Sequence, residues 1–459
     1  MPHQKSLDQK TKAETFQDKL DYLLRTAKKQ GADACDAVIY AGQSEAVSWR
    51  LGKLEDVEGS ESSDLGLRVF VGKKQAIVSS SDISDDEFDQ LVDRALDMAR
   101  NAPEDPYGGL ADPELLALKS SDIPPLDLYD DTEKSADELK ELAREIEEVA
   151  LDVSGITNSE GASANHGTGL IVTANSNGFS GHYQSSNFGL SISVIAGKDN
   201  AMERDYAYSS KRHFTDLDNP ASLGQEAAEK AIRRLGPRKA KTCQVPVVYD
   251  PRVSRTLIGH LAGAINGQAI ARGTSFLKDM MDKQVFTSGI SVIDDPHIIR
   301  GPSSKPFDGE GCRNARLDII KEGLLRNWTL DSSSARQLGL TSNGRASRGT
   351  SSPPSPSSTN FYIAAGDISV EDLIGDIKSG LYITELIGMG VNGITGDYSR
   401  GAGGFWIEDG KITYPVNEIT IAGNLKDMFM NMTAADDLNI KYGTDAPTLR
   451  IEGMITAGS

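Results

Sequence analysis

Cysteine is scarce in this chain of 459 residues, which contains only Cys35, Cys243 and Cys312. The three lie far apart and form no CxxC pair, so they supply neither a disulfide framework nor a cysteine-pair zinc site. Long apolar runs are also missing, since no stretch reaches the roughly 20 apolar residues that a membrane-spanning helix needs. The opening segment MPHQKSLDQKTKAETF lacks the apolar centre of a signal peptide. We therefore expect a cytoplasmic protein without membrane contact.

Positive charge is also in short supply. The chain has 48 lysines and arginines against 67 acidic residues, a formal charge of −19. Nucleic-acid affinity comes largely from basic residues on phosphates, so this balance argues against direct nucleic-acid binding. The densest basic run, from Arg233 to Lys241, is most simply the end of a helix followed by a linker.

Familiar catalytic motifs are absent too: the sequence has no P-loop, HExxH, GxSxG elbow or EF-hand loop. Its six histidines never stand three or four residues apart, as ligands on one helix face would. The run from Gly388 to Gly393 fits GxGxxG, but the following ITGDYSRGAGG cannot begin the helix that a dinucleotide site requires. We interpret that run as a glycine-rich turn between strands.

What is present indicates a multidomain α+β protein. A length prior of roughly 150 residues per domain suggests about three. Helix, hairpins and helix in residues 1–102 predict an N-terminal α+β domain with an antiparallel sheet. A proline-rich linker (103–130) and a central α+β domain (131–236) follow. Many strands in residues 237–459 predict a C-terminal barrel-like domain with flanking helices.

The most distinctive predicted helix begins at Asp250-Pro251, an N-cap followed by proline at the first helical position. Its apolar side chains recur every four residues and predict a buried face, and Gly273 is its predicted stop. His260 lies on or beside that face. The later segment SNGRASRGTSSPPSPSS (342–358) is rich in serine and proline and predicts an exposed, mobile loop.

The C-terminal third carries a longer signature. It contains N-x-x-T-G-D-Y-S-x-G-A-x-G at Asn392–Gly404 and I-E-x-G at Ile407–Gly410. P-T-L-R-I at Pro447–Ile451 and D-G-E-G at Asp308–Gly311 complete it. With the strand LGLRVFVGKK near the start, these features closely resemble the TldD/PmbA family, also called the modulator-of-DNA-gyrase family. The resemblance extends over nearly the whole chain. It implies a two-lobed subunit that forms dimers.

The resemblance also says where a metal would be. One branch of the family carries HExxxH on a helix and a cysteine near the C-terminus, which together hold zinc. The segment ARGTSF, which follows the predicted helix, resembles the family's R-x-G-T-S and aligns the motif positions with Ile258, Gly259 and Gly263. The segment ADDLNIKYGTDAPTLRI near the end has no cysteine. The chain therefore resembles the PmbA (TldE) branch. This implies no metal and no catalytic residue in this chain, with zinc in a TldD-type partner.

Three functional hypotheses follow. The first, by resemblance, is a PmbA/TldE-type subunit that pairs with a zinc-bearing TldD-type subunit to cleave peptides or unfolded segments, in peptide maturation or antitoxin degradation. The alternative is a non-enzymatic homodimeric binding or scaffold protein. A metal-free hydrolase using Asp397 or Ser399 ranks last, because neither has a paired base. The sequence identifies five candidate substrate-binding residues, which could instead be turn formers: Asn392, Thr395, Asp397, Ser399 and Arg400.

Overall fold

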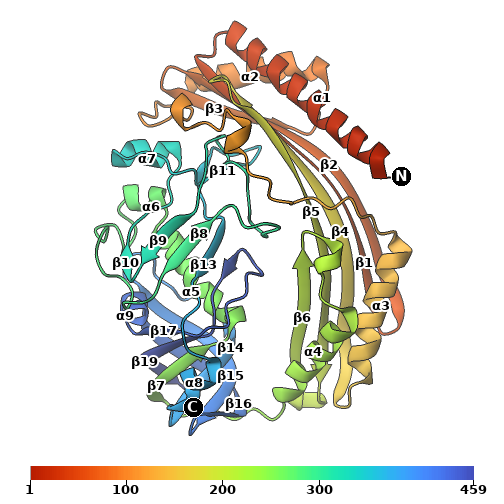
Figure 1. Ribbon diagram of the computed structural model, residues 1–459, viewed down its shortest axis with the longest axis vertical. Coiled ribbons are helices and arrows are strands. Elements are labelled where there is room, and N and C mark those ends of the chain that lie inside the picture. The colour runs from red at the N-terminus through yellow and green to blue at the C-terminus, as the bar shows by residue number, and fades with distance from the viewer. Residues whose placement is uncertain (1, 459) are drawn as a thin grey trace.

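One long antiparallel sheet dominates the N-terminal half of the protein. The computed structural model describes residues 2–458, and the sheet has the strand order β3-β2-β1-β4-β5-β6. Four of its strands are unusually long, so the sheet curves through most of the height of the molecule (Figure 1). The strands are β1 (Ala34–Arg50), β2 (Lys53–Val71), β3 (Lys74–Ser80), β4 (Ile156–Asn175), β5 (Ser180–Ala196) and β6 (Glu203–Lys211).

Strand β1 joins the two N-terminal units into this single sheet. It pairs with β2 on one side and with β4 on the other, where Asp36 lies opposite Asn175. Strand β3 pairs only with residues 65–71 of β2. The chain segments on either side of 103–130 therefore contribute to one layer, and the boundaries drawn between them stay predictions.

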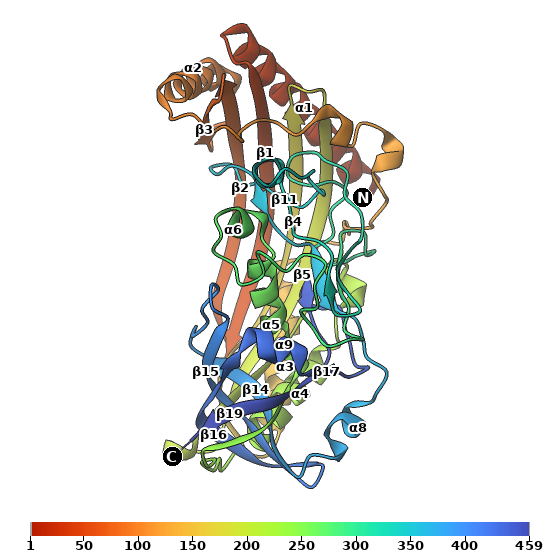
Figure 2. The same ribbon diagram turned by 90° about the vertical axis from the view of Figure 1, so that its left-hand side faces the viewer.

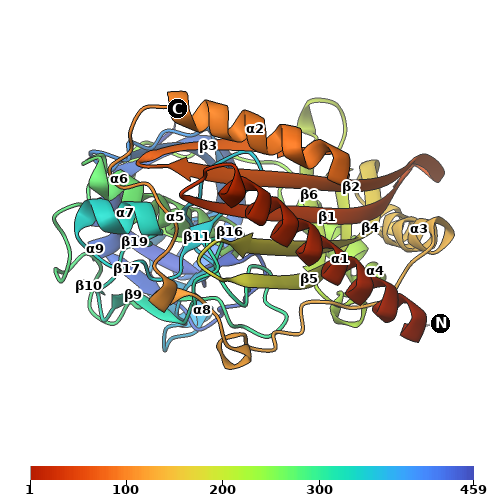
Figure 3. The ribbon, with the colours of Figure 1, turned by 90° about the horizontal axis from the view of Figure 1, so that it is seen from above.

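Four helices cover one face of the sheet, the convex face (Figures 1 and 3). Alternate residues of each strand point toward them, because successive side chains of a strand point to opposite faces. Helices α1 and α2 pack over one end of the sheet around Ile39 and Leu67, and α3 and α4 over the other end around Val47 and Ile192. The helices are α1 (Pro2–Lys29), α2 (Asp85–Asn101), α3 (Ala136–Asp152) and α4 (Pro220–Arg233).

The C-terminal half contains a small barrel. Its strands run in the order β16-β15-β14-β7-β19, and pairing of β16 with β19 closes the ring; β17 extends it at the edge. The predicted fold class, α+β with an antiparallel N-terminal sheet and a barrel-like C-terminal domain with flanking helices, is confirmed. The strands are β7 (Cys243–Tyr249), β14 (Ser379–Ile387), β15 (Asp397–Glu408), β16 (Lys411–Asn424), β17 (Met432–Ala434) and β19 (Leu449–Ala457).

A second, five-stranded sheet lies beside the barrel and shares its core, with helix α5 (Pro251–Ala264) packed against both. Figure 2 shows the C-terminal elements stacked along the long axis in front of the N-terminal sheet. The remaining elements are β8 (Val292–Asp295), β9 (Leu317–Lys321), β10 (Leu324–Leu325), β11 (Ala346–Ser347), β12 (Ser355–Pro356), β13 (Asn360–Ile363), β18 (Thr444–Asp445), α6 (Gly267–Ala271), α7 (Ser332–Leu338), α8 (Val370–Gly375) and α9 (Leu425–Met430).

Helix α5 begins as the sequence predicts, with Oδ1 of Asp250 accepting a hydrogen bond from the Arg252 N–H at 3.0 Å. The prediction of one continuous helix to Gly273 is wrong. Asn266 interrupts it, because its side chain caps the N–H groups of Gln268 and Ala269 and so begins the separate helix α6. Gly273, with φ of +71°, then ends α6 in the left-handed conformation.

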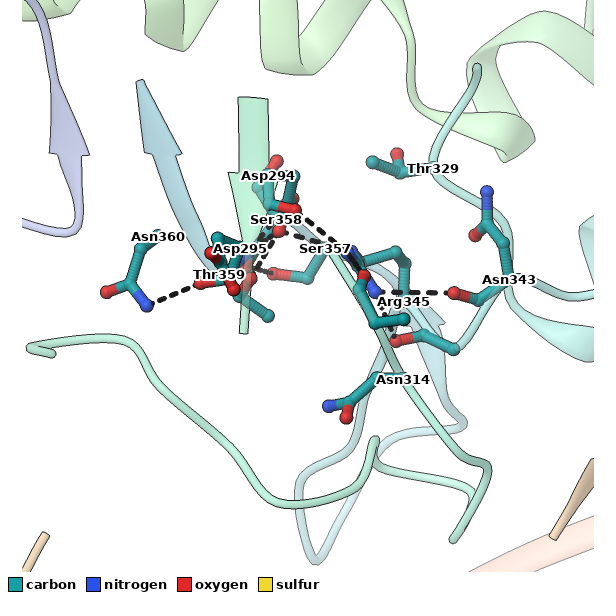
Figure 4. A network of polar contacts seen from close by, with 12 residues as sticks. Asp294, Asp295, Asn314, Thr329, Asn343, Arg345, Ser357, Ser358, Thr359 and Asn360 are labelled. Atoms are coloured by element: carbon teal, nitrogen blue, oxygen red, sulfur yellow. Dashed lines mark hydrogen bonds and ion pairs between the residues drawn. The ribbon is translucent and has the colours of Figure 1, made fainter. Parts of the chain in front are cut away.

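The predicted exposed loop at 342–358 is also not what the structure contains. Arg345 is completely buried, and its Nε lies 3.1 Å from Oδ1 of Asp294 in the network that Figure 4 shows. Thr359 donates its backbone N–H to the same carboxylate. Arg348 reaches across to the N-terminal sheet, where its Nη1 lies 2.5 Å from Oδ1 of Asp36. Residues 351–353 and Ser355 are exposed, but Arg345 and Arg348 anchor the loop in the core and to the N-terminal sheet.

In the part of the chain that the structure describes, we find no helix with the length and apolar character to cross a membrane.

Candidate functional site

The concave face of the N-terminal sheet turns toward the C-terminal half and differs sharply from the convex face. Glycine and small polar side chains alternate with the buried apolar ones that meet the helices. Cross-strand register aligns them in rows, such as Ser44, Gly167 and Asn187. Such a surface offers accessible backbone and hydroxyl groups without charge or large apolar area. Its members on β1, β4 and β5 include Gly42, Ser44, Ser163, Asn165, Gly167, Gly169, Ser185, Asn187, Gly189 and Ser191.

Three adjoining cavities open on this concave face, with volumes of about 560, 330 and 410 Å³. Asn187 lines all three, so they adjoin one another, and we refer to them together as the hollow. The largest of the three lies where β5 and β6 meet two C-terminal segments, 298–302 and 440–442, and Arg255 of α5. This hollow between the two halves is the candidate functional site.

Buried ion pairs brace the junction beside the hollow. Asp205 of β6 receives two hydrogen bonds from the guanidinium of Arg252 on α5, at 2.7 and 3.2 Å. Burial opposes the charged form of Asp205, but these bonds hold its pKa below the usual value. Arg234, at the end of α4, approaches the same carboxylate at 3.5 Å and also pairs with Glu385 of the barrel. These ion pairs connect the two halves of the molecule beside the hollow.

Helix α5 presents the positions that the family resemblance marks for zinc. Ile258 is completely buried in the C-terminal core. Gly259 and Gly263 are exposed, and a Cβ at either would meet no atom within 4 Å. With Arg255 they stand four residues apart, so the three share one side of the helix. Neither an isoleucine nor a glycine supplies a donor atom, so these positions do not fit a zinc ion.

His260 lies next to those positions but turns toward the barrel. Its ring meets Tyr398 edge-on at 6.0 Å between centroids. Burial, with the charge of Arg400, lowers the pKa of His260 and favours a neutral ring. Its Nε2 is buried and has no hydrogen-bond partner among the described residues. His260 is therefore a neutral imidazole that packs on a tyrosine beside the barrel.

The five predicted substrate-binding residues lie in the loop between β14 and β15 and on the first residues of β15. Oδ1 of Asn392 accepts the N–H groups of Ile394 and Thr395, at 2.9 and 3.2 Å. Thr395 donates its hydroxyl to Asp397 at 2.7 Å. The backbone N–H of Ser399 donates to the Gly390 carbonyl.

Arg400 differs from the other four, because its side chain is buried and only 8% of the residue is exposed. None of the five residues lines the three cavities. Their bonds are those of turn formers, and the substrate-binding role stays a prediction.

One buried group in the described chain combines three potential metal-ligating side chains: Asp308, Glu310 and Cys312. Carboxylate oxygens of Asp308 and Glu310 already accept hydrogen bonds from the protein. Oδ1 of Asp308 accepts the N–H groups of Glu310 and Cys312, and Oε2 of Glu310 accepts from Ser332. Burial, followed by the neighbouring carboxylates, raises the pKa of the Cys312 thiol and disfavours the thiolate that would bind a metal. We interpret this D-G-E-G segment as a buried structural turn.

The sequence reasoning missed the residues that line the hollow. The available signal was the alternation of glycine, serine and asparagine in β4 and β5, which marks a polar face on both strands. No comparable signal marked Arg212, Arg255 and Lys441, which come from separate segments and meet only in the folded chain.

Comparison with protein-family models places three consecutive matches along the chain. Residues 35–99 match the PmbA/TldA metallopeptidase domain 1, residues 129–235 its central domain and residues 242–458 its C-terminal domain. Together they cover most of the chain.

Individual proteins agree. The chain is 41% identical over 429 residues to "Metalloprotease PmbA" of Escherichia coli O157:H7, with 93% of each chain covered. It is 37% identical to "Metalloprotease PmbA homolog" of Haemophilus influenzae, with 98% of each covered. A crystal structure from Bacteroides thetaiotaomicron, described as a candidate modulator of DNA gyrase, superposes with a TM-score of 0.88 at 26% identity, over 96% of this chain and 98% of that one.

Proposed function

Because this chain belongs to the PmbA/TldD metallopeptidase family, we propose that it is the PmbA/TldE-type subunit of a two-subunit peptidase. Its partner is a TldD-type subunit with HExxxH, and the assembly cleaves peptides or unfolded segments. This chain supplies part of the wall that encloses the substrate. The partner supplies the zinc, which activates a water molecule for hydrolysis.

The concave face is the observation that carries this proposal. A wall that many unfolded sequences must pass needs backbone groups that form hydrogen bonds with any peptide, and few side chains that select or retain one. Gly167, Ser163 and Asn187 have that character, and the adjoining cavities follow the same surface. A compact folded domain needs a larger space than these hollows provide, which favours extended substrates.

The α5 positions support the assignment of zinc to the partner. Ile258 is buried in the core, and Gly259 and Gly263 have no side chains. The side of α5 that carries Gly259 and Gly263 is open, but it contributes no metal ligand and no general base. Its chemistry is therefore limited to binding and positioning substrate.

Reconstitution with a TldD-type partner tests the proposal. We expect the isolated chain to hold less than stoichiometric zinc and to cleave no unfolded protein, and the mixture to cleave it. A partner variant with glutamine in place of the motif glutamate is the matched control and should abolish cleavage in the mixture. Stoichiometric zinc in the isolated chain, or cleavage without the partner, would overturn the proposal. A mixture that forms no complex and cleaves nothing would favour the homodimeric scaffold.

A further inference from the structure

The cavity of about 560 Å³ at the junction of the two halves is strongly basic, although the chain as a whole carries a formal charge of −19. One acidic residue lines it, Asp216. Against that single carboxylate stand five cations from β6 and its end, α5 and two C-terminal segments: Lys211, Arg212, Arg255, Arg300 and Lys441. A local excess of positive charge in an acidic protein points to an anionic ligand.

Four of these five cations have no ion-pair partner. Arg300 pairs with Asp127 at 2.6 Å and with Asp216 at 2.9 Å. For Lys211, Arg212, Arg255 and Lys441, no carboxylate oxygen of the described side chains, from residue 11 onward, lies within 4.0 Å. Asp218 and Glu226 act on Lys441, and Asp445 acts on Arg255, only from longer range, so none of these four cations is engaged in a salt bridge.

Arg212 is the clearest case. Its Nη1 and Nη2 donate to the carbonyl oxygens of Ser186 and Pro302, at 3.1 and 2.5 Å. Its Nε is buried and has no hydrogen-bond partner among the described residues. Burial lowers the pKa of Arg212 from its usual value, and no carboxylate compensates that cost. A cation held in place by neutral carbonyls keeps its full charge for an incoming anion.

Aromatic rings hold two further cations without neutralising them. The guanidinium of Arg255 lies 4.5 Å from the centre of the Tyr442 ring, and Nζ of Lys441 lies 5.2 Å from that of Tyr208. Cation–π contacts fix a position while leaving hydrogen-bond donors free. The cavity is thus lined by preorganised donors.

Arg255 also connects the cavity with the open side of α5. Gly259 and Gly263 follow it at intervals of four residues, about 6 Å each along the helix. The glycines have open space above them, so an extended chain that begins at Arg255 can lie along this side without a steric barrier.

From this geometry, and resting on the proposed function for the peptide nature of the substrate, we propose that the basic cavity binds a carboxylate of the peptide substrate and orients the adjoining chain along the Arg255–Gly259–Gly263 side of α5. The carboxylate comes from the C-terminus of the peptide or from an aspartate or glutamate side chain. Both sources present the same anion to Arg212, Arg255 and Lys441.

A binding experiment on the full-length chain tests this directly. A fluorescent peptide with two glutamates and a free C-terminus is compared with its C-terminally amidated form and with its Glu→Gln form, at low and high salt. We expect one of the two neutralised peptides to bind about tenfold more weakly, which identifies the source of the carboxylate. The affinity of the acidic peptide should fall as salt rises.

Variants then locate the site. Arg255→Gln and Lys441→Gln should each weaken binding of the acidic peptide by about tenfold. Neither variant should change the binding of a peptide that is both amidated and free of glutamate. Lys278→Gln removes the same charge from an exposed position outside the cavity and is the matched control. Thermal unfolding shows whether each variant is folded. Because the two variants lie on different elements, one still tests the site if the other misfolds.

The outcomes separate this inference from the proposed function. If the reconstituted complex cleaves unfolded protein but neutralised and acidic peptides bind alike, or both variants bind like the control, the carboxylate site is refuted and the peptidase role stands. If acidic peptides bind through the cavity but the mixture cleaves nothing, the anion site stands and the peptidase role fails.

Discussion

At the scale of single residues, the two glycines of α5 offer the sharpest contrast with ordinary helix composition. Glycine in a helix interior costs stability because the unfolded chain loses more conformational freedom. Gly259 nevertheless stands in the middle of α5 and Gly263 in its last turn, and a Cβ at either would meet no atom within 4 Å. The two glycines leave one side of α5 open. This open side is explained by a substrate that lies along the helix, and not by the stability of the isolated chain.

Replacement of Gly259, in the interior of α5, by alanine should therefore stabilise the protein. A Cβ there meets no atom within 4 Å, and alanine is favoured over glycine in a helix by about 0.5–1 kcal/mol. The free energy of unfolding in urea should rise by that amount. Gly267→Ala in α6 is the matched control, because its Cβ would lie 2.7 Å from Leu330 and Ser334. That variant should be destabilised, and equal effects of the two changes would contradict the packing described here.

Glu310 makes stability depend on pH. Burial, and then the charge of Asp308, raises its pKa, so the folded state binds the proton more tightly than the unfolded state. Its contribution to stability is complete below the usual glutamate pKa of about 4.3 and is lost as pH rises through the raised value.

Glu310→Gln removes this titration. Between pH 5 and pH 9, the free energy of unfolding of the wild type should fall relative to that of the variant by at least about 1.4 kcal/mol, the equivalent of one pKa unit. Urea titrations at a series of pH values measure it. Glu371→Gln, at an exposed position, controls for the loss of one carboxylate, and parallel pH profiles for wild type and Glu310→Gln would refute the prediction.

At the scale of elements, local chemistry made the helix starts predictable. Asp250 before Pro251 carries its own signal, because an N-cap acts within three residues and needs no distant partner. The loop at 342–358 shows the opposite case. Its serines and prolines indicate exposure, but Arg345 and Arg348 meet Asp294 and Asp36, which are 51 and 312 residues away. Such pairings cannot be read from composition.

Arg345→Met should show that this loop is a structural element. Loss of one partner leaves the buried Asp294 carboxylate uncompensated, which costs about 3–5 kcal/mol. The free energy of unfolding measures this loss, and limited proteolysis should cut within 342–358 in the variant but not in the wild type. Arg326→Met removes an exposed ion pair with Asp282 and should cost less than about 1 kcal/mol. If the wild-type loop is cut as readily as that of the variant, the loop is a mobile segment and the prediction is wrong.

At the scale of the whole molecule, the two halves enclose a polar hollow that only the folded chain defines. Strand alternation in β4 and β5 makes the small polar face predictable in principle. Its position opposite α5 was not, because it depends on contacts such as Arg252 with Asp205 between distant segments. The resemblance to a family indicated a two-lobed subunit, but the basic lining of one of the three cavities could be recognised only in the structure.

A bulky side chain on the concave wall should hinder substrate without unfolding the protein. Ser163→Trp should reduce kcat/KM of the reconstituted complex toward an unfolded protein by about tenfold or more, because the indole occupies space that the substrate needs. Ser222→Trp, exposed on α4 at the convex face, should leave the rate unchanged. Equal rates for both variants would show that substrate does not pass this wall.

The pairing of β1 with β4 also has a consequence for the order of events during synthesis. Asp36 finds its partner Asn175 only after 139 further residues have been made. Until then one edge of β1 has no strand paired with it. The first hundred residues therefore leave the ribosome as a sheet of three strands only. Pairing over such a separation is slow compared with hairpin formation. A nascent chain stalled before β4 is therefore expected to expose this edge, and one stalled after Asn175 to protect it.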